Sequence, residues 1–409
     1  MTTPTNHSSL LFRACCLALT VTAMTFAIRA GILNQLSQDF GLSNSQLGWV
    51  NSMAFLGFPV AMIIGGALYN RLGAKILLIV AFVCHILGLG LTITANGFWT
   101  LLISTFFIGF ANGAVEASCN PLIATIHKDN KITMLNRFHV WFPGGIVIGA
   151  ITSKLMTDFA LGWQLQIAVM LVPTVIYGFI ISQQQFPKLD KTIATSTLSN
   201  IKALSQPLFI FMMLCMSLTA TTELGTQQWI DKILAASGAS PMVIMAMITG
   251  LMAVGRYFAG PVIKRLNPVG VLLSSAVISA VGIYSMSVAT GNLVYFAAIL
   301  FAIGVTYLWP TMIGFIAQYT PNTGALGLSI IGGAGMFAVS LWNPVIGQWI
   351  DNARAQATKL TTNTAEAELL AGQSVLANLT LFPMALIVTF ALLYFYINKH
   401  NSSKALATG

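Results

Sequence analysis

Apolar segments long enough to cross a lipid bilayer recur along nearly the whole chain. A helix needs roughly 20 apolar residues to span a hydrocarbon core of about 30 Å. The 409-residue sequence has such segments at about 14–36, 45–69, 76–95, 98–126, 134–157, 163–185, 206–232, 241–263, 268–290, 292–318, 323–350 and 375–397. With 56% hydrophobic and only 7% charged residues, the composition is unlike that of a water-soluble domain. The sequence therefore predicts an all-α polytopic membrane protein with twelve transmembrane helices.

The same composition argues against several other classes of protein. The apolar runs are longer than the roughly ten residues of a barrel strand and do not alternate. All five cysteines fall inside predicted helices, which argues against disulfides and against a metal site. The sequence contains no Gly-rich phosphate loop and no HExxH motif. We expect no enzyme activity, no metal and no cofactor, with a proton gradient, or else a sodium gradient, as the source of energy.

Lysine and arginine are unevenly distributed between the short loops. If the N-terminus is inside, the cytoplasmic side receives twelve of these residues and the other side four. Because cytoplasmic loops carry the excess of Lys and Arg, we expect both termini in the cytoplasm and a location in a bacterial inner membrane. The Lys and Arg residues of the cytoplasmic loops then account for most of the net charge of +9, so we expect no nucleic-acid partner. We expect a monomer whose partners are the bilayer and a small-molecule substrate.

A polar stretch halfway along the chain, 187–205, is interpreted as a cytoplasmic linker. It separates an N-terminal six-helix bundle at 1–186 from a C-terminal one at 206–398, which is followed by a cytoplasmic tail at 399–409. The loop that begins at Gly66 has a counterpart that begins at Gly260, an offset of 194 residues. Duplicated six-helix halves are typical of transporters that rock about a site near the bilayer midplane.

One ionisable residue, Glu116, interrupts the apolar run from Phe98 to Ile126. A charge at that depth costs at least about 2.5 kcal/mol, and such residues usually face a bundle interior or a watery cavity. Asn112, Glu116 and Asn120 are four residues apart and therefore share one helix face. We interpret this polar stripe as part of a solute path, and the alternative is that it only hydrogen-bonds a neighbouring helix.

The 194-residue offset extends the polar pattern into the second half. It maps Arg29 onto Glu223, so the sequence predicts opposite charges at equivalent depths of two helices. Glu223 and Gln227 belong to a second stripe with four-residue spacing. Arg256 is a further deep cation, which either pairs with Glu223 or lies at a cytoplasmic gate.

The offset also maps Glu116 onto Pro310, beside Tyr307 and Trp309. Aromatic rings at a polar site commonly stack on sugar faces, and ordinary helix packing is the alternative role for these two rings. The polar stretch Asp351–Ser374 contains no motif and is expected to be an external loop with a short surface helix.

The loop Asn70-Arg71-Leu72-Gly73-Ala74-Lys75 resembles the signature between the second and third helices of the major facilitator superfamily. That signature usually has an Asp where this chain has Asn70 and an Arg where it has Ala74. The resemblance implies two pseudo-symmetric six-helix bundles. It also implies gating roles for Asn70, Arg71, Lys75 and, in the repeated loop, Lys264 and Arg265, with Arg256 as a further candidate.

A narrower resemblance concerns the fourth helix. Residues 113–121 are similar to a segment of fucose permease-like sugar–proton symporters, and 135–139 resemble the start of the fifth helix in their relatives. The resemblance implies proton coupling by Glu116 and substrate contacts by Asn120, Asn136 and His139. The first-helix acid of fucose permease has no counterpart, because Arg29 occupies that region.

Arg29 is similar to the first-helix arginine of organic anion–proton symporters, which move sugar acids. An arginine clamps a carboxylate through two parallel N–H groups. The alternative is an ion pair of Arg29 with Glu116 or Glu223 that only fixes helix positions. Arg29 favours an anionic substrate and the sugar-symporter motifs favour a neutral sugar, so both classes stay open.

We therefore expect a secondary active transporter that carries a small polar solute together with protons by alternating access. The proton-coupling residues are predicted to be Glu116 and Glu223. The predicted substrate-binding residues are Arg29, Asn112, Asn120, Asn136, His139, Gln227, Tyr307 and Trp309. Two alternatives are a proton-coupled exporter of amphipathic compounds or lipids and a membrane receptor that does not transport.

Overall fold

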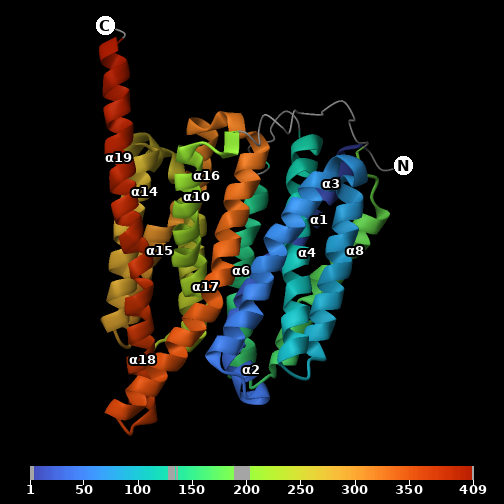
Figure 1. Cartoon of the computed structure of the whole chain (residues 1–409). Helices are drawn as coiled ribbons and strands as arrows, with labels where there is room; N and C mark the ends of the chain where they lie inside the picture. Colours follow the sequence, from blue (N-terminus) through green and yellow to red (C-terminus); the bar gives the residue numbers. More distant parts are fainter. Residues whose placement is uncertain (1–3, 128–133, 135–136, 188–202, 408–409) are drawn as a thin grey trace.

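The computed structural model describes residues 4–127, 134, 137–187 and 203–407, and these residues form helices and connecting turns without a strand. Eleven helical stretches are long and apolar enough to cross a membrane, and α13 (Pro241–Tyr257) is a shorter apolar helix. Together they make up the twelve predicted helices, so the expected all-α polytopic fold is confirmed. Figure 1 shows them as an upright bundle, with α1 to α8 on one side and α10 to α19 on the other.

The first part of the bundle is called the N-half. It consists of α1 (Pro4–Gly31), α2 (Leu33–Phe40), α3 (Asn44–Ile93), α4 (Phe98–Ile126), α6 (Trp141–Asp158), α7 (Trp163–Ala168) and α8 (Leu171–Gln183). Helix α3 contains two membrane spans, because the chain turns at Gly73, where φ is 76°. The predicted linker at 187–205 lies mostly outside the described residues, so the domain boundaries stay a prediction.

The second part is called the C-half. It consists of α10 (Pro207–Ala220), the π-helix η1 (Thr221–Gly225), α11 (Thr226–Gln228), α12 (Ile230–Ile233), α13, α14 (Ala259–Val288), α15 (Leu293–Thr306), α16 (Leu308–Tyr319), the short 3₁₀ turn η2 (Pro321–Thr323), α17 (Gly324–Leu360), α18 (Thr364–Leu379) and α19 (Leu381–Ala407). The expected external loop at 351–374 is wrong in part. Helix α17 continues to Leu360 and α18 begins at Thr364, so only a short turn separates them.

The internal repeat has a counterpart in backbone geometry. Asn267, which is 194 residues after Gly73, interrupts α14 with φ 55° and ψ 166°, and Gly73 has φ 76° and ψ 167°. This conformation is costly for a residue with a side chain. At Asn267 the side-chain oxygen accepts a hydrogen bond from the Gly270 N–H at 2.9 Å, which caps the helix that follows. The two repeated loops therefore turn the chain in the same way.

The end of the bundle that carries α2 and α18, opposite to the ends of α1 and α19 that lie near the chain termini, is called the distal end (Figure 1). Here α3 and α17 cross closely. A Cβ atom on Gly48 would lie 2.5 Å from the Asn343 carbonyl oxygen, and one on Gly347 would collide with the backbone of Asn44. Helices α6 and α13 also pack against each other across the two halves. Because Gly48 and Gly347 have no side chain, the backbones of the two halves come into contact at the distal end.

We expect Gly347→Ala to destabilise the protein, because its Cβ meets backbone atoms that cannot move independently of α3. Overpacking of this kind costs roughly 1–3 kcal/mol. The matched control is Gly314→Ala in α16, where an added Cβ meets nothing within 4 Å. Thermal unfolding of the detergent-purified variants measures the difference, and equal unfolding temperatures would contradict the close crossing.

Candidate transport site

Arg29 lies in the last turn of α1, close to the distal end, and is 4% exposed. Its Nη2 donates a hydrogen bond of 2.9 Å to the Oε1 atom of Gln228, across the two halves. The Nε2 atom of Gln228 in turn donates to the Phe26 carbonyl at 3.2 Å. The guanidinium lies 5.7 Å and 5.9 Å from the ring centres of Phe26 and Phe55. Arg29 is therefore tied into the contact between the halves by a neutral amide and two aromatic rings.

The ion pair that was considered for Arg29, with Glu116 or Glu223, is not present in the structure. Arg29 makes no salt bridge with any carboxylate among the described residues. Depth explains the separation from Glu116. Arg29 is two residues from the distal end of α1, whereas Glu116 is ten residues, roughly 15 Å of helix, from the opposite end of α4. Gln228 was not predicted, because helix depth cannot be read from spacing alone.

Glu223 lies in the π-helical segment η1 and is 5% exposed. Arg256 of α13 donates from Nη2 to its Oε1 at 3.3 Å, which realises one of the two placements expected for Arg256. The Nε atom of Arg256 also donates to the Thr306 carbonyl at 3.0 Å. The other carboxylate oxygen of Glu223 has no protein partner among the described residues. Since π-helical turns frequently occur at functional sites, this pair of a buried carboxylate and a half-buried guanidinium is a candidate centre of the transport path.

The two glutamines that follow the π-helical turn face different neighbours. Gln227 was predicted to share a stripe with Glu223, and both side chains do face α13: the Gln227 amide lies 3.8 Å from the sulfur of Met252, which is one turn before Arg256. Its neighbour Gln228 reaches Arg29. The four-residue spacing therefore identified Gln227 and not Gln228, and nothing in the sequence indicated the π-helical turn at Thr221–Gly225.

Three residues predicted from the fourth and fifth helices do come together. Asn120 donates from Nδ2 to Glu116 Oε2 at 2.7 Å, and His139 Nε2 lies 3.1 Å from Asn120 Oδ1. Glu116 and Asn120 are half-buried and His139 is exposed. The fourth member of the predicted group, Asn136, lies outside the described residues. The Glu116–Asn120–His139 cluster is thus a polar, accessible site on the N-half.

Asn112, which was predicted to line the same path, is fully buried within the N-half. It donates to Thr25 Oγ1 at 2.9 Å, and its oxygen lies 2.9 Å from His85 Nε2. The other ring nitrogen of His85 lies 2.8 Å from the Tyr177 hydroxyl. Because both ends of the amide are engaged, Asn112 serves to connect α1, α3 and α4. His85 was missed by the sequence analysis, although a histidine inside an apolar segment is a detectable signal.

The aromatic candidates lie near the Glu223–Arg256 pair. The Tyr307 hydroxyl donates to the Gly255 carbonyl at 2.9 Å, one residue before Arg256. Trp309 packs against an apolar cluster that both halves contribute to. The members of this cluster are Phe26, Phe55, Phe58, Ala220, Leu224, Met336 and Val339.

The predicted gating residues lie at the end opposite to the distal end, apart from Arg256. Arg71 and Arg265 are exposed. Lys75 donates from Nζ to the Gln184 carbonyl at 3.5 Å and lies 5.8 Å from the Phe186 ring centre. The side chains of Asn70 and Lys264 lie outside the described part of the structure, so their gating roles stay predictions.

Two acidic residues that the sequence analysis did not select hold the halves together at the distal end. Asp351 of α17 accepts hydrogen bonds from the Asn44 N–H at 3.1 Å, the Asn44 side chain at 2.9 Å and the Ser45 N–H at 2.8 Å. A carboxylate at this helix N-terminus is favoured by the helix dipole. Asp231 accepts a hydrogen bond of 2.6 Å from Asn34. The distal contacts between the halves are therefore polar bonds around closely crossing helices.

These features define a membrane transport protein, with two bundles in contact at one end and buried charged side chains between them. The chain belongs to the Major Facilitator Superfamily, whose family model matches residues 15–343. The predicted family and the absence of enzyme activity that it implies are thereby confirmed.

Curated relatives match part of the chain. A D-xylose transporter of Levilactobacillus brevis is 26% identical over 148 residues, which are 36% of this chain and 32% of the relative. A hexuronate transporter of Bacillus subtilis (strain 168) is 25% identical over 169 residues, 38% of this chain and 40% of the relative. The matched stretches thus span about a third to two fifths of these relatives.

A solved structure shows the same fold over nearly the whole chain. It is a bacterial homologue of the human lysosomal transporter Spinster, in an inward-facing and unoccupied conformation, with a TM-score of 0.78 and 13% identity. The similarity covers 94% of this chain and 96% of that one.

Removing one charge of the Glu223–Arg256 pair should destabilise the folded protein more than removing both charges. Arg256→Gln leaves a buried carboxylate uncompensated, which costs roughly 3 kcal/mol, whereas the double variant Glu223→Gln/Arg256→Gln leaves two neutral amides. Thermal unfolding should therefore give a lower melting temperature for the single variant than for the double variant. If the double variant is the less stable of the two, the pair is not a compensated buried charge.

Asp231 lies beyond the end of the membrane-spanning stretch Pro207–Gln228 and gives a prediction for how stability depends on pH. Burial raises the pKa of Asp231 from 3.8 to about 7, although Lys232 and Asn34 oppose this. The folded state therefore holds the proton more tightly than the unfolded state between about pH 4 and pH 7. The stability that Asp231 contributes is present below its unfolded pKa and is lost as the pH rises to about 7.

We expect the melting temperature of the wild type, relative to Asp231→Asn, to fall from about pH 4.5 to about pH 7 and to level off above that. Burial also lowers the pKa of the neighbouring Lys232 to about 8, so its contribution changes at higher pH. The control is Asp158→Asn, whose side chain is 52% exposed. A difference from Asp231→Asn that does not change with pH would show that Asp231 is ionised throughout this range.

Proposed function

We propose that the protein carries a small polar solute, a sugar, sugar acid or other small organic anion, together with protons by alternating access. The proposal places it in a bacterial inner membrane with both termini in the cytoplasm, as the lysine and arginine distribution favours. The distal end then faces the outside, and the contacts described there close the outer side of the path. Similarity to transporters named for D-xylose and hexuronate supports this class of substrate.

The observation that carries the proposal is the ion pair between Glu223, buried in a π-helical turn, and the half-buried Arg256 of α13, beside the contact between the halves. An anionic solute that binds Arg256 draws the guanidinium away from Glu223. The buried carboxylate then loses its counter-charge, and taking up a proton neutralises it. Solute and proton thus bind with positive coupling, which is the requirement for symport. In this proposal Arg256 binds the solute, which is the role that we predicted for Arg29.

A second candidate function is export of amphipathic compounds. The apolar cluster around Phe26, Phe58 and Met336 supports it, because flexible methionine and aromatic side chains accommodate varied apolar ligands. The fold similarity to the Spinster homologue is compatible with both functions, since it concerns the fold alone.

The test is thermal stabilisation of purified protein by a panel of neutral sugars, sugar acids and apolar amphiphiles at about pH 5.5 and about pH 7.5. Symport of an acid predicts stabilisation by sugar acids, stronger at the lower pH, in the wild type and not in Arg256→Gln. Neutral sugars that stabilise both proteins alike would show that Arg256 does not bind the solute. Stabilisation by amphiphiles alone would favour export and contradict the proposal.

Coupling itself is tested by uptake into proteoliposomes with an imposed proton gradient in sodium-free buffer. We expect solute accumulation in the wild type and loss of proton-driven accumulation in Glu223→Gln, with solute exchange retained. Glu116→Gln tests the second predicted coupling residue in the same assay. Solute accumulation that requires sodium and does not depend on the proton gradient would show that the transporter is coupled to sodium.

A further inference from the structure

Arg29 is a buried cation without a counter-ion among the described residues. Arginine stays protonated in proteins, and a charge out of water needs a partner of opposite sign. Only Nη2 has a protein acceptor, and this is the neutral amide of Gln228, while Nε and Nη1 have none in the described part of the chain. The carbonyl end of α1 supplies partial negative charge near Arg29, which offsets a fraction of the positive charge. The remaining charge calls for an anion.

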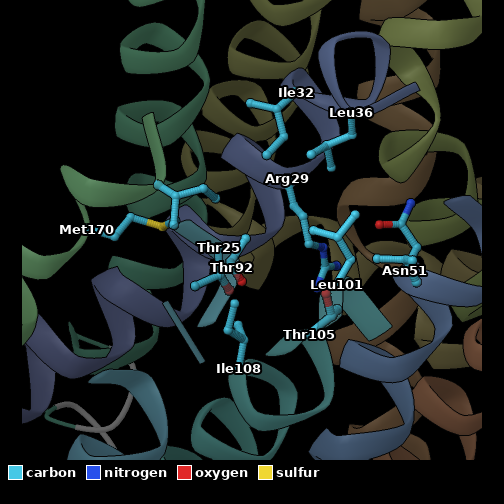
Figure 2. Close-up of a pocket in the computed structure, with 12 residues that line it drawn as sticks. Thr25, Arg29, Ile32, Leu36, Asn51, Thr92, Leu101, Thr105, Ile108 and Met170 are labelled. Carbon is cyan, nitrogen blue, oxygen red and sulfur yellow. The ribbon is translucent and has the colours of Figure 1, made fainter. Parts of the chain in front are cut away.

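The unpartnered nitrogens belong to a side chain that lines a small cavity in the N-half. Figure 2 shows Arg29 extending between Asn51, Leu101 and Thr105 into this cavity. Asn51 of α3 is fully buried, and both its amide nitrogen and its oxygen lack a protein partner. Two buried side chains thus offer N–H groups to the same enclosed space. The residues that line the cavity come from the N-half alone, so it is separate from the Glu223–Arg256 pair.

The size and walls of the cavity restrict what it accepts. It has room for roughly one water-sized group. Thr25 and Thr92 donate their hydroxyl protons to the backbone carbonyls of Thr22 and Gly88. The donors that face the cavity are therefore Arg29, Asn51 and the hydroxyl of Thr105. Much of the rest of the wall is aliphatic. A sugar or sugar acid is too large for this space, and a metal cation is repelled by the guanidinium.

We propose that this cavity binds a small monovalent inorganic anion, of which chloride is the abundant example, between the guanidinium of Arg29 and the amide of Asn51. The anion neutralises Arg29 while Nη2 holds Gln228 across the two halves. It thereby stabilises the conformation in which the distal end is closed. This site goes beyond the proposed symport, because it requires neither solute nor proton gradient.

The test is a chloride titration of the substrate-free purified protein, followed by thermal unfolding. Sodium methanesulfonate replaces sodium chloride at constant ionic strength and pH. We expect the melting temperature to rise with chloride and to saturate, with bromide acting in the same way. Asn51→Leu should raise the half-saturating chloride concentration about tenfold, which corresponds to roughly 1.4 kcal/mol.

The matched control is Thr249→Val in α13, a buried polar residue outside the cavity, which should leave the half-saturating concentration unchanged. If Asn51→Leu does not fold, Asn51→Ser serves in its place, and bromide located by anomalous scattering at Arg29 tests the site in the wild type. Melting temperatures that are equal in chloride and methanesulfonate would overturn the proposal, as would an unchanged titration in the Asn51 variants. Failure of sugar acids to stabilise the protein would leave the chloride result intact and contradict only the symport proposal.

Discussion

A hydrocarbon core provides no partner for a charged side chain, and this constraint determines how the centre of the protein is built. Glu223 is balanced by Arg256 on the adjacent helix α13. Arg29 is held by Gln228 and by the rings of Phe26 and Phe55. These groups come from helices of both halves, so any relative movement of the halves changes the surroundings of a buried charge. The position of the halves and the surroundings of these charges thus depend on the same few side chains.

The contact between the halves at the distal end combines two kinds of interaction with different consequences. The glycines Gly48 and Gly347 bring backbones together and fix where α3 and α17 cross. The polar bonds to Asp351 and Asp231 stabilise that crossing beside apolar residues of both halves, which pack into one cluster. Hydrogen bonds of this type contribute about 1–3 kcal/mol each, and water can replace their partners when the helices separate. Such a closure suits the alternating access that we propose, because its polar partners can be exchanged for water.

The sequence predicted the features that depend on local pattern. Long apolar runs predicted the twelve helices, and the four-residue spacing together with the helix-5 motif brought Glu116, Asn120 and His139 to one cluster. The sequence did not predict the contacts that depend on how far along its helix a residue lies. Gln228 is the partner of Arg29 although it lies outside the four-residue stripe, and nothing in the sequence of Thr221–Gly225 indicates the π-helical turn. Asp351 was assigned to a loop because its polarity resembles that of a loop, whereas it caps α3 from within α17.

The internal repeat explains why the two halves share a shape and yet differ in chemistry. The 194-residue offset relates Gly73 to Asn267, where the backbone is nearly the same, and Arg29 to Glu223, where the charge is opposite. Backbone geometry has to be shared, because two bundles that rock against each other need matching helices. Charge does not have to be shared, because in the proposed symport an acid on one element takes up the proton and a cation on another binds the solute. The buried charges therefore belong to the few positions at which the repeat is free to differ.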